Sequence, residues 1–354
     1  MIDLPDLPLP GHGRTLERFR HFAAVGRRDP VAVRLFEGHA DAAAILAELG
    51  ADPPGGGERW GVWAAAPSSV RASPTAPAPS SALSSGEPAL STGAAGGWRL
   101  NGDRPWCSGA AWCTHALVTA AADDGIRLFA VANTAPHAVP IDGTWPAVGM
   151  AASDSRTIRF TDAPAIPIGG PGDYVGRPGF WHGGVGVAAC WFGGALGVAD
   201  ALRVAASGPK DIGPHAFAHL GAVDVALGAA AAVLESAAAA IDADPRADAH
   251  RLALRARATV EKAATEVIDR VGRALGAGPL CRDAEHARRV ADLTVYLRQS
   301  HAEGDLEQLG RLLADSTPDT GAVQLSASSP PGAEPTRSGA QSDGRLSREG
   351  GLAW

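Results

Sequence analysis

The sequence predicts an α+β protein with a short N-terminal helical region, a central β-barrel domain and a C-terminal four-helix bundle. Three observations predict this order. Helical periodicity dominates up to Gly50, short strand-like segments separated by turn residues follow from Trp60, and long alanine-rich helical segments follow from Gly183. Hydrophobic residues make up 45% of the 354 residues, which is enough to bury a sizeable core.

The N-terminal helical domain is predicted over residues 1–58, which is about half the length expected for a complete domain of this kind. One helix is expected over 14–50, because its apolar residues recur at mostly helical spacing and Gly50 is a typical stop. These apolar residues are Leu35, Ala42, Ile45, Leu46 and Leu49. The run from Pro53 to Gly57 then marks a boundary.

The β-barrel domain is predicted over residues 59–169. Short strands are expected from Trp60 onward and again from Gly97, with hairpin turns at Asn101-Gly102 and at Asp123-Asp124-Gly125. The later strands are expected at 116–120, 126–131 and 157–160. A low-complexity insertion is predicted over 70–96, because this stretch is rich in Ser, Pro, Ala and Gly and poor in large apolar residues.

The C-terminal bundle is predicted over residues 170–316 and a disordered tail over 317–354. Long helices joined by short loops usually form an antiparallel bundle, and the expected helices cover 183–206, 215–241, 246–275 and 284–313. The last of them should break between Ser300 and Gly304, because the apolar stripe before this point is out of phase with the stripe after it.

Charge and composition exclude several classes of function. Lysine and arginine number 31 and aspartate and glutamate 38, so the net charge of −7 argues against nucleic acid as a partner. The four cysteines form no C-x-x-C pair, which favours a reducing, cytoplasmic location. The longest weakly polar run, Val185 to Ala199, is shorter than the ~20 residues of a membrane span, so no span is expected.

Two patterns that resemble binding motifs are given structural interpretations. Gly183 to Ala189 contains G-x-G-x-x-A, but no strand precedes it, so close helix packing is favoured over a dinucleotide site. His215 and His219 share a helix face, yet no acidic third ligand lies at a recognisable spacing, so no metal site is predicted.

Three segments carry a resemblance to the acyl-CoA dehydrogenase family. Residues 97–110, GWRLNGDRPWCSGA, resemble the family's strand-and-loop motif. Residues 148–155, VGMAASDS, resemble its next turn, and the strand TIRFTDAP at 157–164 follows. Residues 274–283, ALGAGPLCRD, resemble the segment between its last helices. The family is built as a helical domain, a β-barrel and a four-helix bundle, which matches the order that composition predicts.

The resemblance implies an FAD-dependent enzyme that oxidises an acyl-CoA thioester between its α and β carbons and passes electrons to an acceptor such as a flavoprotein. It places Trp106 beside the flavin and Ser108 near the flavin N5 and O4 atoms. It places Arg273 and Gly276 against the adenosine side of FAD in a partner subunit. A homo- or hetero-oligomer formed through the bundle is therefore expected.

The catalytic base is the main departure from the family pattern. Family members use a glutamate between the last two helices, and Ser300 lies nearest that position here. Glu303 is a displaced candidate base and His301 is the alternative. The flavin-contacting stretch is also reduced, to Ala65-Ala66-Pro67-Ser68-Ser69. Two alternatives therefore stay open, a flavin-dependent monooxygenase on the same fold and a non-catalytic partner subunit of a heteromeric dehydrogenase.

Overall fold

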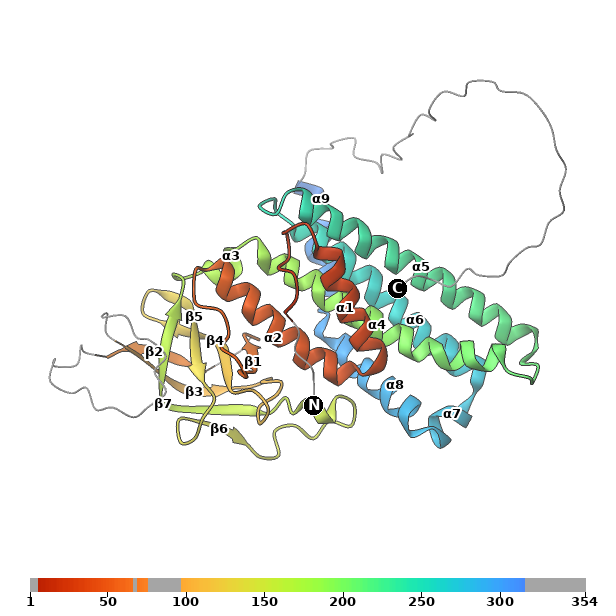
Figure 1. The fold of residues 1–354 in the computed structure, drawn as a ribbon, viewed down its shortest axis with the longest axis horizontal. Coiled ribbons are helices and arrows are strands. Elements are labelled where there is room, and N and C mark those ends of the chain that lie inside the picture. The colour runs from red at the N-terminus through yellow and green to blue at the C-terminus, as the bar shows by residue number, and fades with distance from the viewer. Residues whose placement is uncertain (1–5, 66–68, 76–96, 316–354) are drawn as a thin grey trace, which may run out of the picture.

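The computed structural model describes residues 6–65, 69–75 and 97–315. The second of two N-terminal helices lies between a β-barrel and a bundle of long helices, and the first packs against the bundle (Figure 1). The helices are α1 (Thr15–Arg28) and α2 (Pro30–Glu48), so residues 14–50 are largely helical as predicted but form two helices in place of one. The chain breaks at Asp29, whose backbone is extended and whose side chain caps the Val31 and Ala32 amides, and Pro30 suits the first turn of α2.

Five strands close a barrel, and two more strands extend it. The ring runs β2 (Arg71–Pro74), β3 (Trp98–Arg104), β7 (Thr157–Ile168), β5 (Gly125–Ala132), β4 (His115–Ala122) and back to β2. Outside the ring, β1 (Trp60–Trp63) pairs in parallel with β4, and β6 (Ala138–Ile141) pairs with β7. The central barrel domain predicted from the sequence is thus observed, and the turn at Asp123-Asp124 joins β4 to β5 as expected.

The Asn101-Gly102 pair does not form the predicted hairpin turn. It lies inside β3, which pairs with β2 on one side and β7 on the other, and the register shifts between Leu100 and Gly102. Gly102 has φ 122°, and a Cβ there would lie 2.6 Å from the Ser69 carbonyl oxygen. Gly102 therefore allows a bulge in β3 and the close approach of the Ser69 backbone, and both are common reasons for a glycine inside a strand.

The described part of the predicted insertion also differs from expectation. The strand β2 lies within 70–96 and completes the barrel, so the insertion as predicted begins too early. Its short sequence Arg-Ala-Ser-Pro carries almost no hydrophobic signal, and only Ala72 is buried. Most of the remaining insertion and the whole predicted tail lie outside the described residues.

The described part of the bundle is built from three long helices and several shorter ones. The long helices are α4 (Gly179–Ser207), α5 (Gly213–Ala243) and α6 (His250–Leu275), and the shorter ones are α3 (Asp173–Gly176), α7 (Ala277–Arg282), α8 (Ala284–Tyr296) and α9 (Glu303–Asp315). A 3₁₀ turn over Leu297–Gln299 separates α8 from α9, which confirms the predicted break near Ser300. Short helices such as α3 and α7 lie outside the predicted helix ranges.

Glycines allow α1 to cross α4 at close range. A Cβ on Gly193 would lie 2.3 Å from the Ala23 carbonyl oxygen, and one on Gly197 would lie 2.3 Å from the Arg27 carbonyl oxygen. Earlier in α4, a Cβ on Gly186 would lie 3.2 Å from the Phe22 ring. The glycine-rich start of α4 therefore serves helix packing, as the sequence predicted.

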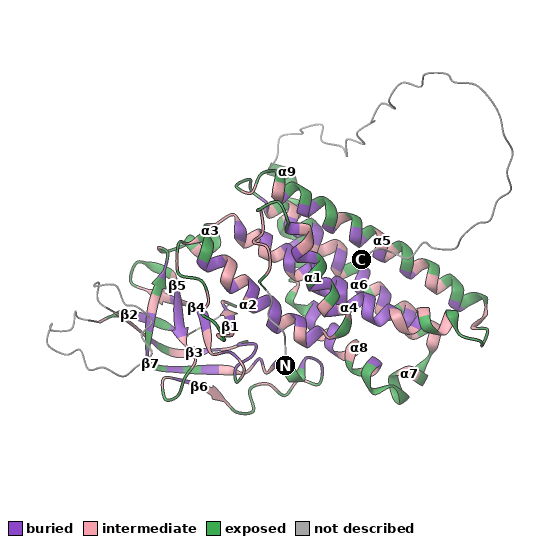
Figure 2. Ribbon diagram, viewed as in Figure 1, coloured by how far each residue is buried: buried purple, intermediate pink, exposed green. Residues whose placement is uncertain are grey.

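The helices α4 and α5 differ sharply in burial. By length and composition both helices are long and apolar enough to cross a membrane. The run Val185–Ala199, on which the expectation of no span was based, covers only part of α4. In α4, 83% of the most apolar window is buried, which is typical of a central core helix. In α5 only 28% is buried, and Figure 2 shows much of its outer face exposed.

Candidate functional site

Trp106 presents a flat aromatic surface just after β3. Its side chain is 57% exposed, and its ring meets Trp145 edge-on, with centroids 5.9 Å apart. Its φ of 65° lies in the left-handed region, which costs a non-glycine residue about 1–2 kcal/mol. Strain of this kind persists where the surrounding structure imposes it, and it often marks a ligand site.

The loop that follows Trp106 is held against the turn at 153–156. The amides of Cys107, Gly109 and Ala110 donate to carbonyl oxygens of Arg156, Ser153 and Asp154, at 3.0, 2.7 and 3.0 Å. Two of the three motif segments found in the sequence, 97–110 and 148–155, are therefore in direct contact. This contact fixes the backbone on which the predicted site residues stand.

Ser108 belongs to a short chain of hydroxyl groups. Its Oγ lies 2.8 Å from Ser155 Oγ, which lies 2.9 Å from Ser153 Oγ. Three hydroxyls carry three protons, whereas two links use two of them, so one proton remains to be donated elsewhere. The Ser108 carbonyl oxygen is already occupied, because it accepts from Trp63 Nε1 at 3.0 Å and from the Cys113 thiol at 3.7 Å.

The same turn docks on α8. The Met150 amide donates to Asp292 Oδ1 at 2.6 Å, and Trp145 Nε1 donates to the Met150 carbonyl oxygen at 3.1 Å. A Cβ on Gly149 would lie only 2.1 Å from the Ala291 carbonyl oxygen, so this position requires glycine. The barrel loops and the bundle therefore meet at Trp145 and α8, close to Trp106.

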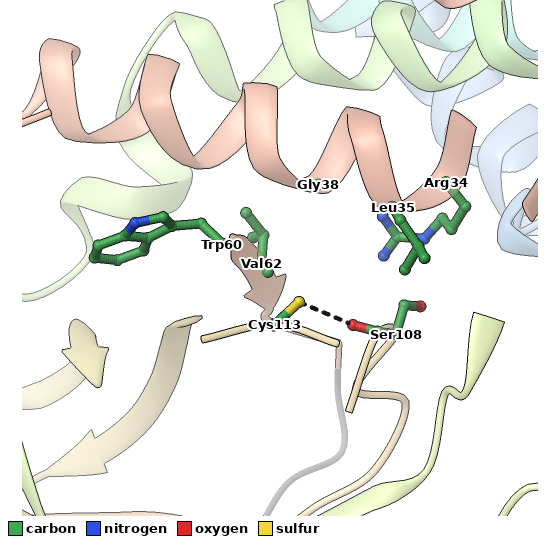
Figure 3. Close-up of a pocket in the computed structure, with 8 residues that line it drawn as sticks. Arg34, Leu35, Gly38, Trp60, Val62, Ser108 and Cys113 are labelled. Atoms are coloured by element: carbon green, nitrogen blue, oxygen red, sulfur yellow. Dashed lines mark hydrogen bonds between the residues drawn. The ribbon is translucent and has the colours of Figure 1, made fainter. Parts of the chain in front are cut away.

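A small cavity lies between α2 and the barrel, with Ser108 in its wall (Figure 3). Its volume of about 10 Å³ has room for one water-sized group. Arg34 extends from α2 on the side of Ser108, and Gly38 and Gly61 also line the cavity. The remaining lining residues are Leu35, Trp60, Val62 and Cys113.

Arg34 and Glu37 form a buried, hydrogen-bonded pair beside this cavity. Arg34 Nη1 donates to Glu37 Oε2 at 2.6 Å, and the two side chains are only 13% and 6% exposed. Arg34 Nε is buried without a hydrogen-bond partner among the described residues, and so is the Tyr296 hydroxyl. Tyr296 lies near Cys190 and packs edge-on against Trp191. A polar group buried without a partner costs about 1–3 kcal/mol.

The cysteines near the site are not nucleophiles at neutral pH. Burial raises the pKa of the Cys113 thiol to about 12, with Arg34 and Arg59 only partly opposing the shift. Burial also raises the pKa of Cys107. Because the thiolate is the reactive form, neither side chain supports covalent catalysis.

The two candidate bases lie at the α8–α9 junction. His301 is 81% exposed, and its Nδ1 lies 3.1 Å from Asp305 Oδ1. Arg257 holds this junction, since its Nη2 donates to the Gln299 carbonyl oxygen at 3.0 Å and its Nε lies 3.7 Å from Asp305 Oδ2. Glu303 is exposed on the first turn of α9. Of the two candidates, His301 is thus the one with an orienting carboxylate.

Arg273 and Gly276 lie at the end of α6, next to α7, on the side of the bundle away from the barrel (Figure 1). Arg273 is 64% exposed and lies 3.5 Å from Asp269. Gly276 has φ 65°, and a Cβ added there would meet no atom within 4 Å among the described residues. Within one chain, these residues are not brought to Trp106 and Ser108.

The structure adds residues that sequence reasoning missed. Arg34 and Tyr296 are brought into one buried region by helices far apart in the chain. In the sequence, the only feature that marks Arg34 is its i, i+3 spacing to Glu37. This spacing does not indicate burial, because Arg14 and Glu17 have the same spacing on an exposed part of α1.

No protein-family model matches the chain, and no curated protein matches it. Solved structures do match. The dibenzothiophene monooxygenase TdsC from Paenibacillus sp. A11-2, in complex with FMN and indole, aligns with TM-score 0.67 and 16% identity over 84% of this chain and 83% of its own. The methanesulfinate monooxygenase MsuC from Pseudomonas fluorescens aligns with TM-score 0.68 and 16% identity over 86% and 84%.

A variant of the Tcur3481–Tcur3483 steroid ACAD also aligns, with TM-score 0.64 and 19% identity over 84% of this chain and 81% of its own. Most of each chain takes part in these alignments, and the shared parts are the N-terminal helices, the barrel and the bundle. The chain therefore has the acyl-CoA dehydrogenase-like fold, which flavin-dependent monooxygenases also adopt.

Proposed function

We propose that this chain is a flavin-dependent oxidoreductase of the monooxygenase type, which inserts oxygen into a small molecule. The observation that carries this choice is the α8–α9 junction, where the sequence offers Ser300 and His301 in place of the glutamate that α,β-oxidation of an acyl-CoA requires. The resemblance to TdsC and MsuC favours the same choice. The acyl-CoA dehydrogenase first expected from the sequence becomes the less favoured interpretation.

The residues around Trp106 fit a flavin ring. Trp106 offers an uncovered indole face, and an isoalloxazine packed on it would remove apolar surface from water. Ser108 lies two residues after Trp106, and its contact with the flavin edge stays a prediction. When bound, the flavin would supply the redox chemistry, accepting electrons and passing them to dioxygen.

We propose FMN as the cofactor in place of FAD. The support is the resemblance to TdsC, which was solved with FMN, whereas Arg273 and Gly276 were expected to contact the adenosine half of FAD only across a subunit interface. FMN ends at its phosphate and needs no such contact. Mass spectrometry of the released cofactor distinguishes FMN from FAD directly.

His301 is the residue best placed to move a proton at the α8–α9 junction. Asp305 lies 3.1 Å from its Nδ1, an arrangement that favours a proton on Nδ1 and leaves Nε2 as the acceptor. Glu303 has no such orienting carboxylate among the described residues and remains the weaker candidate. His301→Ala should therefore lower turnover more than Glu303→Gln does.

The test is the way in which bound flavin becomes reduced. The purified chain should show flavin absorption bands, keep them when acyl-CoA is added under nitrogen, and lose them when a separate flavin reductase and NADH are supplied. Bleaching by acyl-CoA alone would instead establish a dehydrogenase. A chain that binds neither FMN nor FAD would be a non-catalytic partner subunit.

A further inference from the structure

The cavity between α2 and β1 is lined by groups that donate hydrogen bonds. The Arg34 guanidinium can only donate, and the hydroxyl chain of Ser108, Ser155 and Ser153 keeps one proton beyond its two internal links, whereas the Cys113 thiol already donates to the Ser108 carbonyl oxygen. The Ser108 carbonyl oxygen is already taken by Trp63 and Cys113. No carboxylate is among the described residues that line the cavity.

Arg34 is also incompletely satisfied. Its guanidinium stays charged at any physiological pH, yet Glu37 contacts only Nη1, and Nε is buried without a partner in the described part of the chain. A buried guanidinium normally requires a full set of acceptors. The residue that carries this unpartnered nitrogen is also one of those that line the cavity.

We propose that this cavity binds an oxyanion of the substrate, held by Arg34 and Ser108, so that the substrate is a small organic acid. Since the cavity has room for one water-sized group, a single oxygen of the acid enters it and the rest of the molecule stays outside it. That the bound anion is a substrate depends on the proposed function. That the cavity binds an anion depends only on the residues that line it.

Glu37 gives the site a pH dependence with a definite sign. Burial raises the pKa of Glu37 to about 8 against the opposing charge of Arg34, so the carboxyl is mostly protonated at neutral pH. Arg34 is then free to pair with a bound anion. Above that pKa Glu37 ionises and competes for Arg34. The charged and titratable groups facing Glu37 are Arg18 of α1, Arg34 and Asp41 of α2, Tyr174 of α3, Cys190 of α4, Arg257 of α6 and Tyr296 of α8.

Acetate and its uncharged counterpart acetamide are suitable probes. Binding is measured by calorimetry on the full-length chain at equal ionic strength, with and without FMN. Acetate should bind at pH 7 and acetamide should not. Arg34→Met should weaken acetate binding by roughly tenfold or more. Arg14→Met is the matched control, because Arg14 pairs with Glu17 at the same spacing on an exposed surface and should bind acetate like the parent.

The pH dependence of acetate binding can be tested even if Arg34→Met does not fold, because it is measured on the parent chain and on Glu37→Gln. From about pH 7 to about pH 9, acetate affinity should fall in the parent chain and stay constant in Glu37→Gln. Equal binding of acetate and acetamide, an equal loss in Arg14→Met, or no acetate binding at all would overturn the proposal. If the chain binds acetate but takes up no flavin, the anion site is supported and the proposed function is rejected. If the chain takes up flavin but does not bind acetate, the proposed function is supported and the anion site is rejected.

Discussion

At the scale of single residues, the site combines an exposed aromatic ring with buried polar groups that lack partners. Trp106 is strained and uncovered, and Arg34 and the Tyr296 hydroxyl are buried with unmet hydrogen bonds among the described residues. Stability alone does not account for either feature, because each costs about 1–3 kcal/mol. Such costs are typical of residues arranged for a ligand.

Trp106→Ala should weaken flavin retention with little change in thermal stability. The ring is 57% exposed, so its removal takes away little buried area in the flavin-free chain. The flavin would lose the face on which it packs. The measurement is the flavin-to-protein absorbance ratio after gel filtration, beside the melting temperature. Trp98→Phe, in the strand leading to the loop, is the aromatic control and should retain flavin. Unchanged flavin content in Trp106→Ala would contradict the assignment.

At the scale of elements, the crossing of α1 and α4 decides how the N-terminal helices sit against the bundle. Gly193 lies under the Ala23 backbone, and no side-chain rearrangement makes room for a methyl group there. Backbone atoms move only when a whole helix shifts. This contact therefore also fixes α2, which carries Arg34 to the cavity.

Gly193→Ala should destabilise the fold by about 1–3 kcal/mol, the usual cost of overpacking. The control is Gly221→Ala in α5, where no described atom lies within 4 Å of the added methyl. That change should be neutral or stabilise by about 0.5–1 kcal/mol, because glycine is a poor residue in a helix interior. Urea unfolding of both variants compares the two effects. A Gly193→Ala protein as stable as Gly221→Ala would show that α1 and α4 do not cross as closely as described.

At the scale of the whole molecule, α5 leaves an apolar face without cover in the described part of the chain. Only 28% of its most apolar window is buried, Val225 and Phe217 are 74% and 49% exposed, and its sequence holds no Lys or Arg. A second subunit would bury this face, at about 25 cal/mol per Å² of apolar area. The expectation of an oligomer formed through the bundle therefore stays a prediction, with α5 as its location.

Val225→Asp should reduce the oligomer to monomers, because burying the new charge in the interface would be costly. Light scattering at micromolar concentration measures the mass. Ile126→Asp changes a residue of similar exposure on the barrel, 58%, and should leave the mass unchanged. A parent chain that is monomeric would contradict this prediction, and equal effects of both variants would place the interface elsewhere.

The sequence by itself determined the order of the fold, because helical and strand periodicities are local properties. It also located the turn at Asp123-Asp124 and the break after α8, where a phase slip or a tight turn is visible within a few residues. Of the site, it selected Trp106 and Ser108 through a motif, and it marked His301 and Glu303 by their place in that break. These four assignments stay predictions.

Only the tertiary structure decided what depends on partners far away in the chain. Asn101-Gly102 locally predicts a turn, but strands on both sides hold it extended, and pairing with two distant segments outweighs a two-residue preference. The local pattern of Arg34 is that of one half of a surface ion pair. Its Nε lacks an acceptor among the described residues only because the surrounding elements close around Arg34 and exclude water, which makes a missing hydrogen bond costly.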